Sequence, residues 1–275
     1  MNTERIERSS RYFDERLNTS FEALLQPIDN QSPAGYPVKG SSVYQTIRNA
    51  KQEDDASLPL GPWVHQLKRA DWPTVSRTAI DALLHQSKDL QLAAWLLEAQ
   101  VHQIGFSAVA PAVRLIEGLL RNYGDNLYPQ ISDNGCEHRA NILRYTVKMV
   151  AIALKQQPLT QAGHAREYSL FDGESAQRLE QIKARSTMSS TVMPEEEAVT
   201  LADLTSAMHA SATAWYQSLR LNLYDALSAM SQLKQTIEAN FADEAPDLSG
   251  LSDVLIHINE LVQTELQRRG VPTPG

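Results

Sequence analysis

The chain has 275 residues, a formal net charge of −8 at pH 7 and a pI of about 5.4. An acidic chain lacks the phosphate-neutralising surface that general nucleic-acid binding requires, so we expect no nucleic-acid partner. Its one cysteine cannot form an internal disulfide. Its apolar runs, such as Leu92–Leu97, are far shorter than the ~20 residues of a membrane span, so we expect a cytoplasmic protein without membrane insertion.

Apolar residues recur at helical spacing along most of the chain, whereas strand signals are nearly absent, so the sequence predicts an all-α protein. The first stripe runs from Phe13 to Leu25 and ends before Pro27. The segment Pro27–Gly40 carries three prolines and two glycines and predicts an ordered loop or extended arm. Further helices are expected over residues 43–50, 73–84, 88–104, 113–120 and 142–153.

Three helix starts in this region carry capping signals. Gly61 stands before a proline, an arrangement that favours a short helix after it. Asp71 precedes Trp72 and a second proline, which predicts a helix start favoured by the helix dipole. Ser87 is the predicted N-cap of a helix that begins at Lys88.

Residues 1–157 are therefore predicted to form a multi-helix bundle domain, followed by a second, smaller helical block over residues 195–270. A joint over residues 158–194, with one helix from about Asp172, separates them, and we expect the fragment 1–157 to fold alone. Pro194 marks a predicted helix start, and the second block after it contains helical stripes over residues 201–215, 223–237 and 251–262. Residues 271–275 are interpreted as the start of a linker.

No catalytic or metal-binding pattern is present in the sequence. The seven histidines never stand three or four residues apart, and phosphate-binding, dinucleotide-binding and nucleophile-elbow motifs are absent. We therefore expect no enzymatic activity, no metal and no cofactor. The basic pair Arg268-Arg269 is interpreted as part of a solvated helix face.

Three tryptophans are the most informative side chains, and two interpretations of them stay open. Trp63, Trp72 and Trp95 either hold the segment 61–72 on the bundle, or one of them is exposed as a binding anchor.

Several short motifs occur in one order along residues 20–130. They are Leu24-Leu25-Gln26-Pro27-Ile28, Ser32-Pro33-Ala34-Gly35, Gly61-Pro62-Trp63, Lys68-Arg69-Ala70-Asp71-Trp72, the run from Ser87 to Ala99, and Tyr128-Pro129. In that order the chain resembles the ImpA N-terminal domain of TssA-type proteins of the bacterial type VI secretion system, with a weaker likeness over 200–270. The sequence departs from the family's usual acidic Gly-Glu-Asp, since Gly35 is followed by Tyr36 and Pro37. The residues that carry the motifs, to which we assign a structural role, are Pro27, Pro33, Gly35, Gly61, Trp63, Asp71, Trp72, Ser87, Lys88, Asp89, Leu90 and Trp95.

The resemblance implies a non-enzymatic assembly factor, located at the cytoplasmic face of the inner membrane once the machine is assembled. Such a factor binds baseplate, sheath, tail-tube and membrane-complex proteins and helps to initiate or position tail and sheath polymerisation. The family's ring-forming C-terminal domain is not evident in the sequence, so we expect oligomerisation to depend on that missing domain.

Two alternatives stay open: a fragment of a membrane-linked, TagA-like sheath-stop protein, and a cytoplasmic helical adaptor unrelated to secretion. Loops on a rigid helical scaffold are favoured recognition sites. As candidate protein-binding side chains we therefore name Tyr36 and Val38, which lie in the 27–40 segment and are expected to be exposed.

Overall fold

The computed structural model describes residues 2–53, 68–131, 135–161, 163, 166–185 and 199–272. Within these ranges the regular structure consists of α-helices and short 3-10 helices, with isolated bridges but no strands, so the all-α prediction is confirmed there. None of the described helices has the length and apolar character needed to cross a bilayer. The predicted helix starts at Gly61 and Pro194, and Trp63 between them, lie outside the described residues.

The described α-helices vary widely in length. They are α1 (Asn2–Leu17), α2 (Phe21–Leu25), α3 (Ser42–Ala50), α4 (Trp72–His85), α5 (Leu90–Ile104), α6 (Val109–Tyr123), α7 (Glu137–Lys155), α8 (Leu170–Arg185), α9 (Leu201–Ala210), α10 (Thr213–Phe241) and α11 (Ser249–Arg268).

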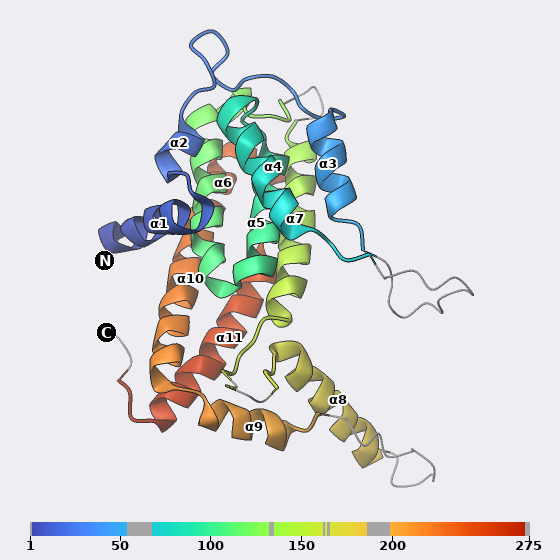
Figure 1. The fold of residues 1–275 in the computed structure, drawn as a ribbon, viewed down its shortest axis with the longest axis vertical. Coiled ribbons are helices and arrows are strands. Elements are labelled where there is room, and N and C mark those ends of the chain that lie inside the picture. Colours follow the sequence, from blue (N-terminus) through green and yellow to red (C-terminus); the bar gives the residue numbers. More distant parts are fainter. Residues whose placement is uncertain are drawn as a thin grey trace, which may run out of the picture.

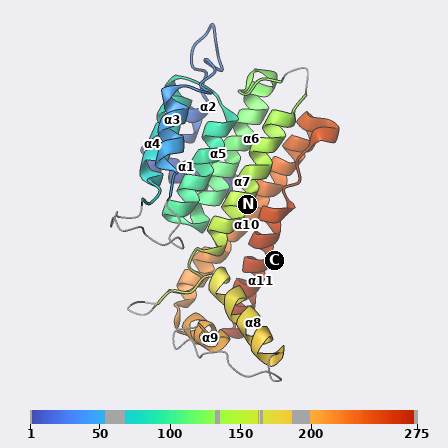
Figure 2. The same cartoon turned by 90° about the vertical axis from the view of Figure 1, so that its right-hand side faces the viewer.

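Helix α5 lies at the centre of an elongated bundle (Figure 1). It packs against α4, α6 and α7, and every residue from Leu92 to Val101 is buried, as expected for a helix that is apolar on nearly all sides. Helix α1 and the short helix α2 lie against α6, and α3 lies against α4. Helices α8 and α9 pack mainly on each other at the lower end of the bundle (Figure 2).

One continuous core joins the two predicted blocks. It extends from Phe13 in α1 to Leu266 in α11, because the long helix α10 lies along α6 and α11 packs against both α10 and α7 (Figure 1). The two predicted blocks, 1–157 and 195–270, therefore share one hydrophobic core. The helices after residue 212 cover an apolar face of the helices before residue 157.

Two predicted helices are broken where the sequence pattern continues. The stripe from Phe13 to Leu25 forms α1 and α2, because Asn18 adopts a positive φ of 51° and the Ser20 hydroxyl caps α2 by accepting from the Ala23 N–H at 3.0 Å. The stripe over residues 201–215 breaks at Ser211, whose extended backbone ends α9. Helix α10 then starts at Thr213 and contains the next predicted stripe.

Candidate functional site

Three segments that are distant in sequence meet beside the start of α5. The Lys88 N–H donates to the Ala34 carbonyl at 2.8 Å, and the Tyr128 N–H donates to the Lys88 carbonyl at 3.0 Å. The Tyr36 N–H donates to the Gln86 carbonyl at 3.0 Å. We call this crossing the arm junction, and it comprises residues 34–36, 86–90 and 127–129. It unites motif residues that the sequence analysis treated separately.

Lys88 fixes the arm junction from inside. Its side chain is fully buried, and Nζ donates to the carbonyls of Leu24 at 2.9 Å and Leu83 at 2.6 Å. These carbonyls belong to the last turns of α2 and α4, where helices leave acceptors unpaired. Burial lowers the pKa of Lys88 to about 8. The lysine therefore ties the ends of two helices to the segment that starts α5.

Asp89, and not Ser87, is the N-cap of α5. Its Oδ1 accepts from the Gln91 N–H at 2.7 Å, and its Oδ2 accepts from the Tyr44 hydroxyl at 2.9 Å. Burial raises the pKa of Asp89 to about 6, against the opposing effect of these hydrogen bonds. The Ser87 hydroxyl is buried and has no hydrogen-bond partner among the described residues. The prediction of a cap at Ser87 is wrong, because the helix begins at Leu90.

The arm, residues 26–41, is an ordered loop, as predicted. The Ile28 N–H donates to the Pro33 carbonyl at 2.9 Å, and the Ser32 hydroxyl donates to the Gly35 carbonyl at 2.7 Å. Gly35 has a φ of +73°, and a Cβ placed there would lie 2.1 Å from the Gln86 carbonyl oxygen. Close backbone approach and positive φ together require glycine at this position.

The two candidate binding side chains of the arm differ in exposure. Tyr36 is 64% exposed, and its backbone is held by the arm junction. Val38 is only 6% exposed and belongs to the core, so the expectation that it is exposed is wrong. The arm thus presents one large aromatic side chain and uses the valine for its own attachment.

Trp95 is a core residue of the bundle. Its ring packs edge-on against Tyr44 with centroids 4.7 Å apart, and the Lys51 ammonium lies 5.9 Å from the ring centroid. Lys51 also pairs with the buried carboxylate of Glu98. Trp95 therefore helps to attach α3 to α5.

Trp72 is half-buried at the start of α4. Its ring stacks on the His102 ring with centroids 4.1 Å apart and an interplanar angle of 5°. The helix start predicted at this point is confirmed, and Asp71 is its N-cap, accepting from the Thr74 N–H at 3.0 Å. Both described tryptophans of the predicted trio thus pack against the bundle.

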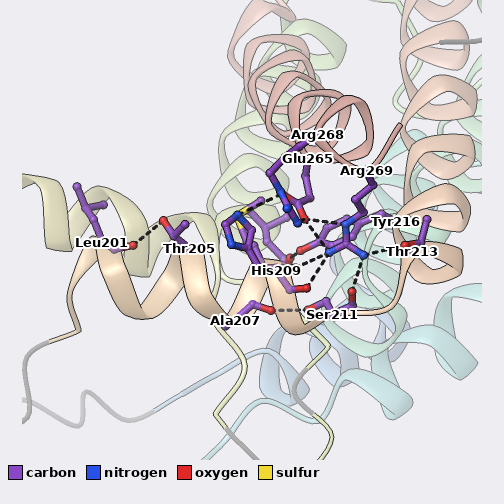
Figure 3. Close-up of polar contacts among 12 residues, drawn as sticks. Leu201, Thr205, Ala207, His209, Ser211, Thr213, Tyr216, Glu265, Arg268 and Arg269 are labelled. Carbon is purple, nitrogen blue, oxygen red and sulfur yellow. Dashed lines mark hydrogen bonds and ion pairs between the residues drawn. The ribbon is translucent and has the colours of Figure 1, made fainter. Parts of the chain in front are cut away.

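A second polar cluster fastens α9 to the end of α11 (Figure 3). Arg269 donates to the carbonyls of Met208 at 2.7 Å and Ser211 at 2.6 Å, and its guanidinium lies 5.0 Å from the centroid of the Tyr216 ring. Its side chain is only 11% exposed, so the expectation of a solvated basic pair is wrong for Arg269.

Glu265 stands at the centre of this cluster. Its buried carboxylate accepts from Arg268 at 2.8 and 2.9 Å and from Arg269 at 2.7 Å (Figure 3). These hydrogen bonds, with that of Arg268 the largest, outweigh burial and lower the pKa of Glu265 to about 2. No sequence pattern pointed to the contacts of Arg269 with α9, because Met208 and Ser211 lie 61 and 58 residues from it in the chain.

Neither cluster is arranged for metal binding. Among the described histidine, cysteine, aspartate and glutamate residues, no group of three or more could hold a metal ion. The charged groups of the arm junction and of the Glu265 cluster are engaged with helix ends and with each other. This arrangement can position the arm and the α8–α9 pair on the bundle.

The family comparison covers the arm junction. A family model described as "ImpA, N-terminal, type VI secretion system" matches residues 25–148. A solved structure of the N-terminal domain of the TssA component of the type VI secretion system from Burkholderia cenocepacia, which includes the ImpA N-terminal region, superposes with a TM-score of 0.79. It is 25% identical and covers 92% of this chain and 96% of that one. The chain therefore contains an ImpA N-terminal region and is similar to TssA components of the type VI secretion system.

A curated relative agrees with this assignment. Type VI secretion system component TssA1 of Pseudomonas aeruginosa is 30% identical over 129 residues, which are 44% of this chain. The match spans only 35% of the length of that relative. The likeness predicted over residues 20–130 is confirmed, and the structural match extends it over the helices where the sequence resemblance was weaker.

Proposed function

We propose that this TssA-like chain is a non-enzymatic assembly module that binds other type VI secretion proteins through the arm. The observation that carries the proposal is the Tyr36 ring, which is exposed on a loop whose backbone is fixed by the arm junction. An aromatic side chain presented on a rigid base loses little conformational freedom on binding and is a common anchor in interfaces.

The proposed partners are baseplate and sheath components, with tail-tube and membrane-complex proteins as further contacts, and the proposed role is to initiate or position tail and sheath polymerisation. The site would then lie in the cytoplasm, at the cytoplasmic face of the inner membrane in the assembled machine. Both relatives are TssA components, which favours this role over a TagA-like sheath-stop role or an unrelated adaptor.

Capture of purified baseplate and sheath proteins by immobilised chain tests the role of the arm. We expect Tyr36→Ala to weaken capture of at least one component about tenfold or more, as for an aromatic interface anchor. Tyr145→Ala on α7 is a matched control, because that ring is 55% exposed and far from the arm in sequence. Capture of every component at wild-type strength by a folded Tyr36→Ala variant would exclude the arm as the docking surface.

A further inference from the structure

A pocket of about 400 Å³ lies between α1, α6 and α10. Arg114, Glu117 and Arg121 line it from α6, Gln232 and Gln235 line it from α10, and Ile6 lines it from α1. Ile6 is 49% exposed and Arg121 is exposed, so these two side chains form its outer rim. The pocket combines apolar, amide and cationic groups, and it is separate from the arm junction.

Arg114 is the unusual residue of this pocket, because only 6% of it is exposed and part of its guanidinium is unpaired. Its Nη1 donates to the Ser9 hydroxyl at 2.5 Å and to the Arg5 carbonyl. Its Nε and Nη2 are buried without a hydrogen-bond partner within the described ranges of the chain. Buried charged donors are costly to leave unpaired, so an acceptor at this edge would be strongly favoured.

The same guanidinium edge binds carboxylates elsewhere in this chain. In Arg8, Nε and Nη2 donate to the two carboxylate oxygens of Asp225 at 2.7 and 2.8 Å. In Arg268, they donate to Glu265 at 2.9 and 2.8 Å. A carboxylate has the planar, two-oxygen geometry that matches two parallel N–H donors.

The acidic groups nearest to Arg114 are engaged with other partners. Glu117 accepts from Arg121 at 3.3 Å and from the Thr236 hydroxyl at 3.1 Å, while Asp225 binds Arg8. The pocket therefore has two arginines and one carboxylate in a chain whose net charge is −8. This local excess of positive charge is complementary to an acidic ligand.

We propose that the pocket binds the side-chain carboxylate of an aspartate or glutamate in a segment of a partner protein, with the Nε–Nη2 edge of Arg114 as its bidentate donor. The volume is in the range of pockets that enclose a ligand larger than a single anion, and the apolar and amide groups suit the adjoining peptide. Because both nitrogens are buried, binding requires a local adjustment of the Arg114 side chain. The proposal is independent of the role of Tyr36.

NMR of the ¹⁵N-labelled chain tests this site by following the arginine Nε–H signals. The probes are a blocked octapeptide of glycine and serine with one central glutamate, the same peptide with glutamine instead, and inorganic phosphate. We expect the glutamate peptide to shift the Arg114 signal saturably and to bind at least about tenfold more tightly than the glutamine peptide. An unmoved Arg114 signal, equal binding of both peptides, or tighter binding of phosphate would overturn the proposal.

Variants assign the binding to the planar edge of Arg114. Arg114→Gln should lose about tenfold in affinity for the glutamate peptide, and Arg114→Lys should not recover it, since an ammonium cannot donate in the fork geometry. Arg144→Gln on α7 is the control, because Arg144 is exposed and bonds only to Asn141 among the described contacts. Full binding by Arg114→Lys would refute the bidentate geometry. The wild-type NMR measurement decides the question even if the Arg114→Gln variant does not fold.

Discussion

Glu265→Gln is expected to destabilise the chain strongly at neutral pH and much less in acid. The wild-type carboxylate is buried and accepts from Arg268 and Arg269, which lowers its pKa from the ordinary value of 4.5 to about 2. A difference of this size corresponds to about 3 kcal/mol of stabilisation of the folded state. Glutamine cannot carry the charge that provides this stabilisation.

The sign of the pH dependence follows from the lowered pKa. The stabilisation is fully present above the unfolded-state pKa of Glu265 and is lost as the pH falls toward the folded-state pKa. The difference in unfolding free energy between wild type and variant should therefore fall from about 3 kcal/mol at pH 7 to about 1 kcal/mol at pH 3.

Urea unfolding followed by circular dichroism at pH 7, 5, 4 and 3 measures this difference. Glu238→Gln is the control, because the Glu238 side chain is 57% exposed and lies 3.8 Å from Lys234. An exposed pair of this kind contributes less than about 1 kcal/mol. A difference between wild type and Glu265→Gln that is independent of pH, or no larger than that of the control at pH 7, would refute the reasoning.

Three further changes test the arm junction and the core. Gly35→Ala should destabilise by about 3 kcal/mol or more in thermal unfolding, whereas Gly40→Ala, which has a positive φ but open space around it, should cost about 1 kcal/mol. Asp89→Ala should destabilise the chain by about 1 to 2 kcal/mol because it removes the cap of α5. Ser87→Ala should cost less because the Ser87 hydroxyl is unpaired among the described residues. The opposite order of the two variants in urea unfolding would contradict the assignment of the cap. The shared core replaces the sequence-based expectation that fragment 1–157 folds alone. The fragment should bind hydrophobic dyes and aggregate in light scattering because it lacks α10, and a monodisperse, cooperatively unfolding fragment would show two separable cores.

The sequence predicted helix existence well, because apolar periodicity directly reports which side of a helix is buried. It placed the start of α4 at Asp71-Trp72-Pro73, where an acidic residue and a proline mark the first turn. It misplaced the cap of α5, where Ser87 and Asp89 are both good cap residues. The position of the cap depends on Lys88, which lies before the first residue of α5 and donates from Nζ to the carbonyls of Leu24 and Leu83. That requirement arises only from tertiary packing.

The sequence did not predict which distant segments contact each other. The periodicity of α10 shows an apolar stripe but does not say that α6 covers it, and two blocks with separate cores fit the same pattern. Arg269 and Arg114 look like ordinary surface cations in the sequence. Their burial follows from neighbours contributed by other helices, such as Met208 for Arg269 and Ser9 for Arg114.

Helix α2 lies between the two proposed binding surfaces and relates them to each other. At its start, Phe21 lines the pocket of Arg114, and near its end the Leu24 carbonyl accepts from Lys88 beneath the arm. Leu25 packs closely on Gly118 of α6, where an added Cβ would come within 3.0 Å of the leucine. The arm and the pocket are therefore attached to the same short helix. A partner that uses both surfaces must therefore present a receptor for the Tyr36 ring and an acidic side chain at a matching spacing, which a folded protein surface provides better than a flexible peptide does.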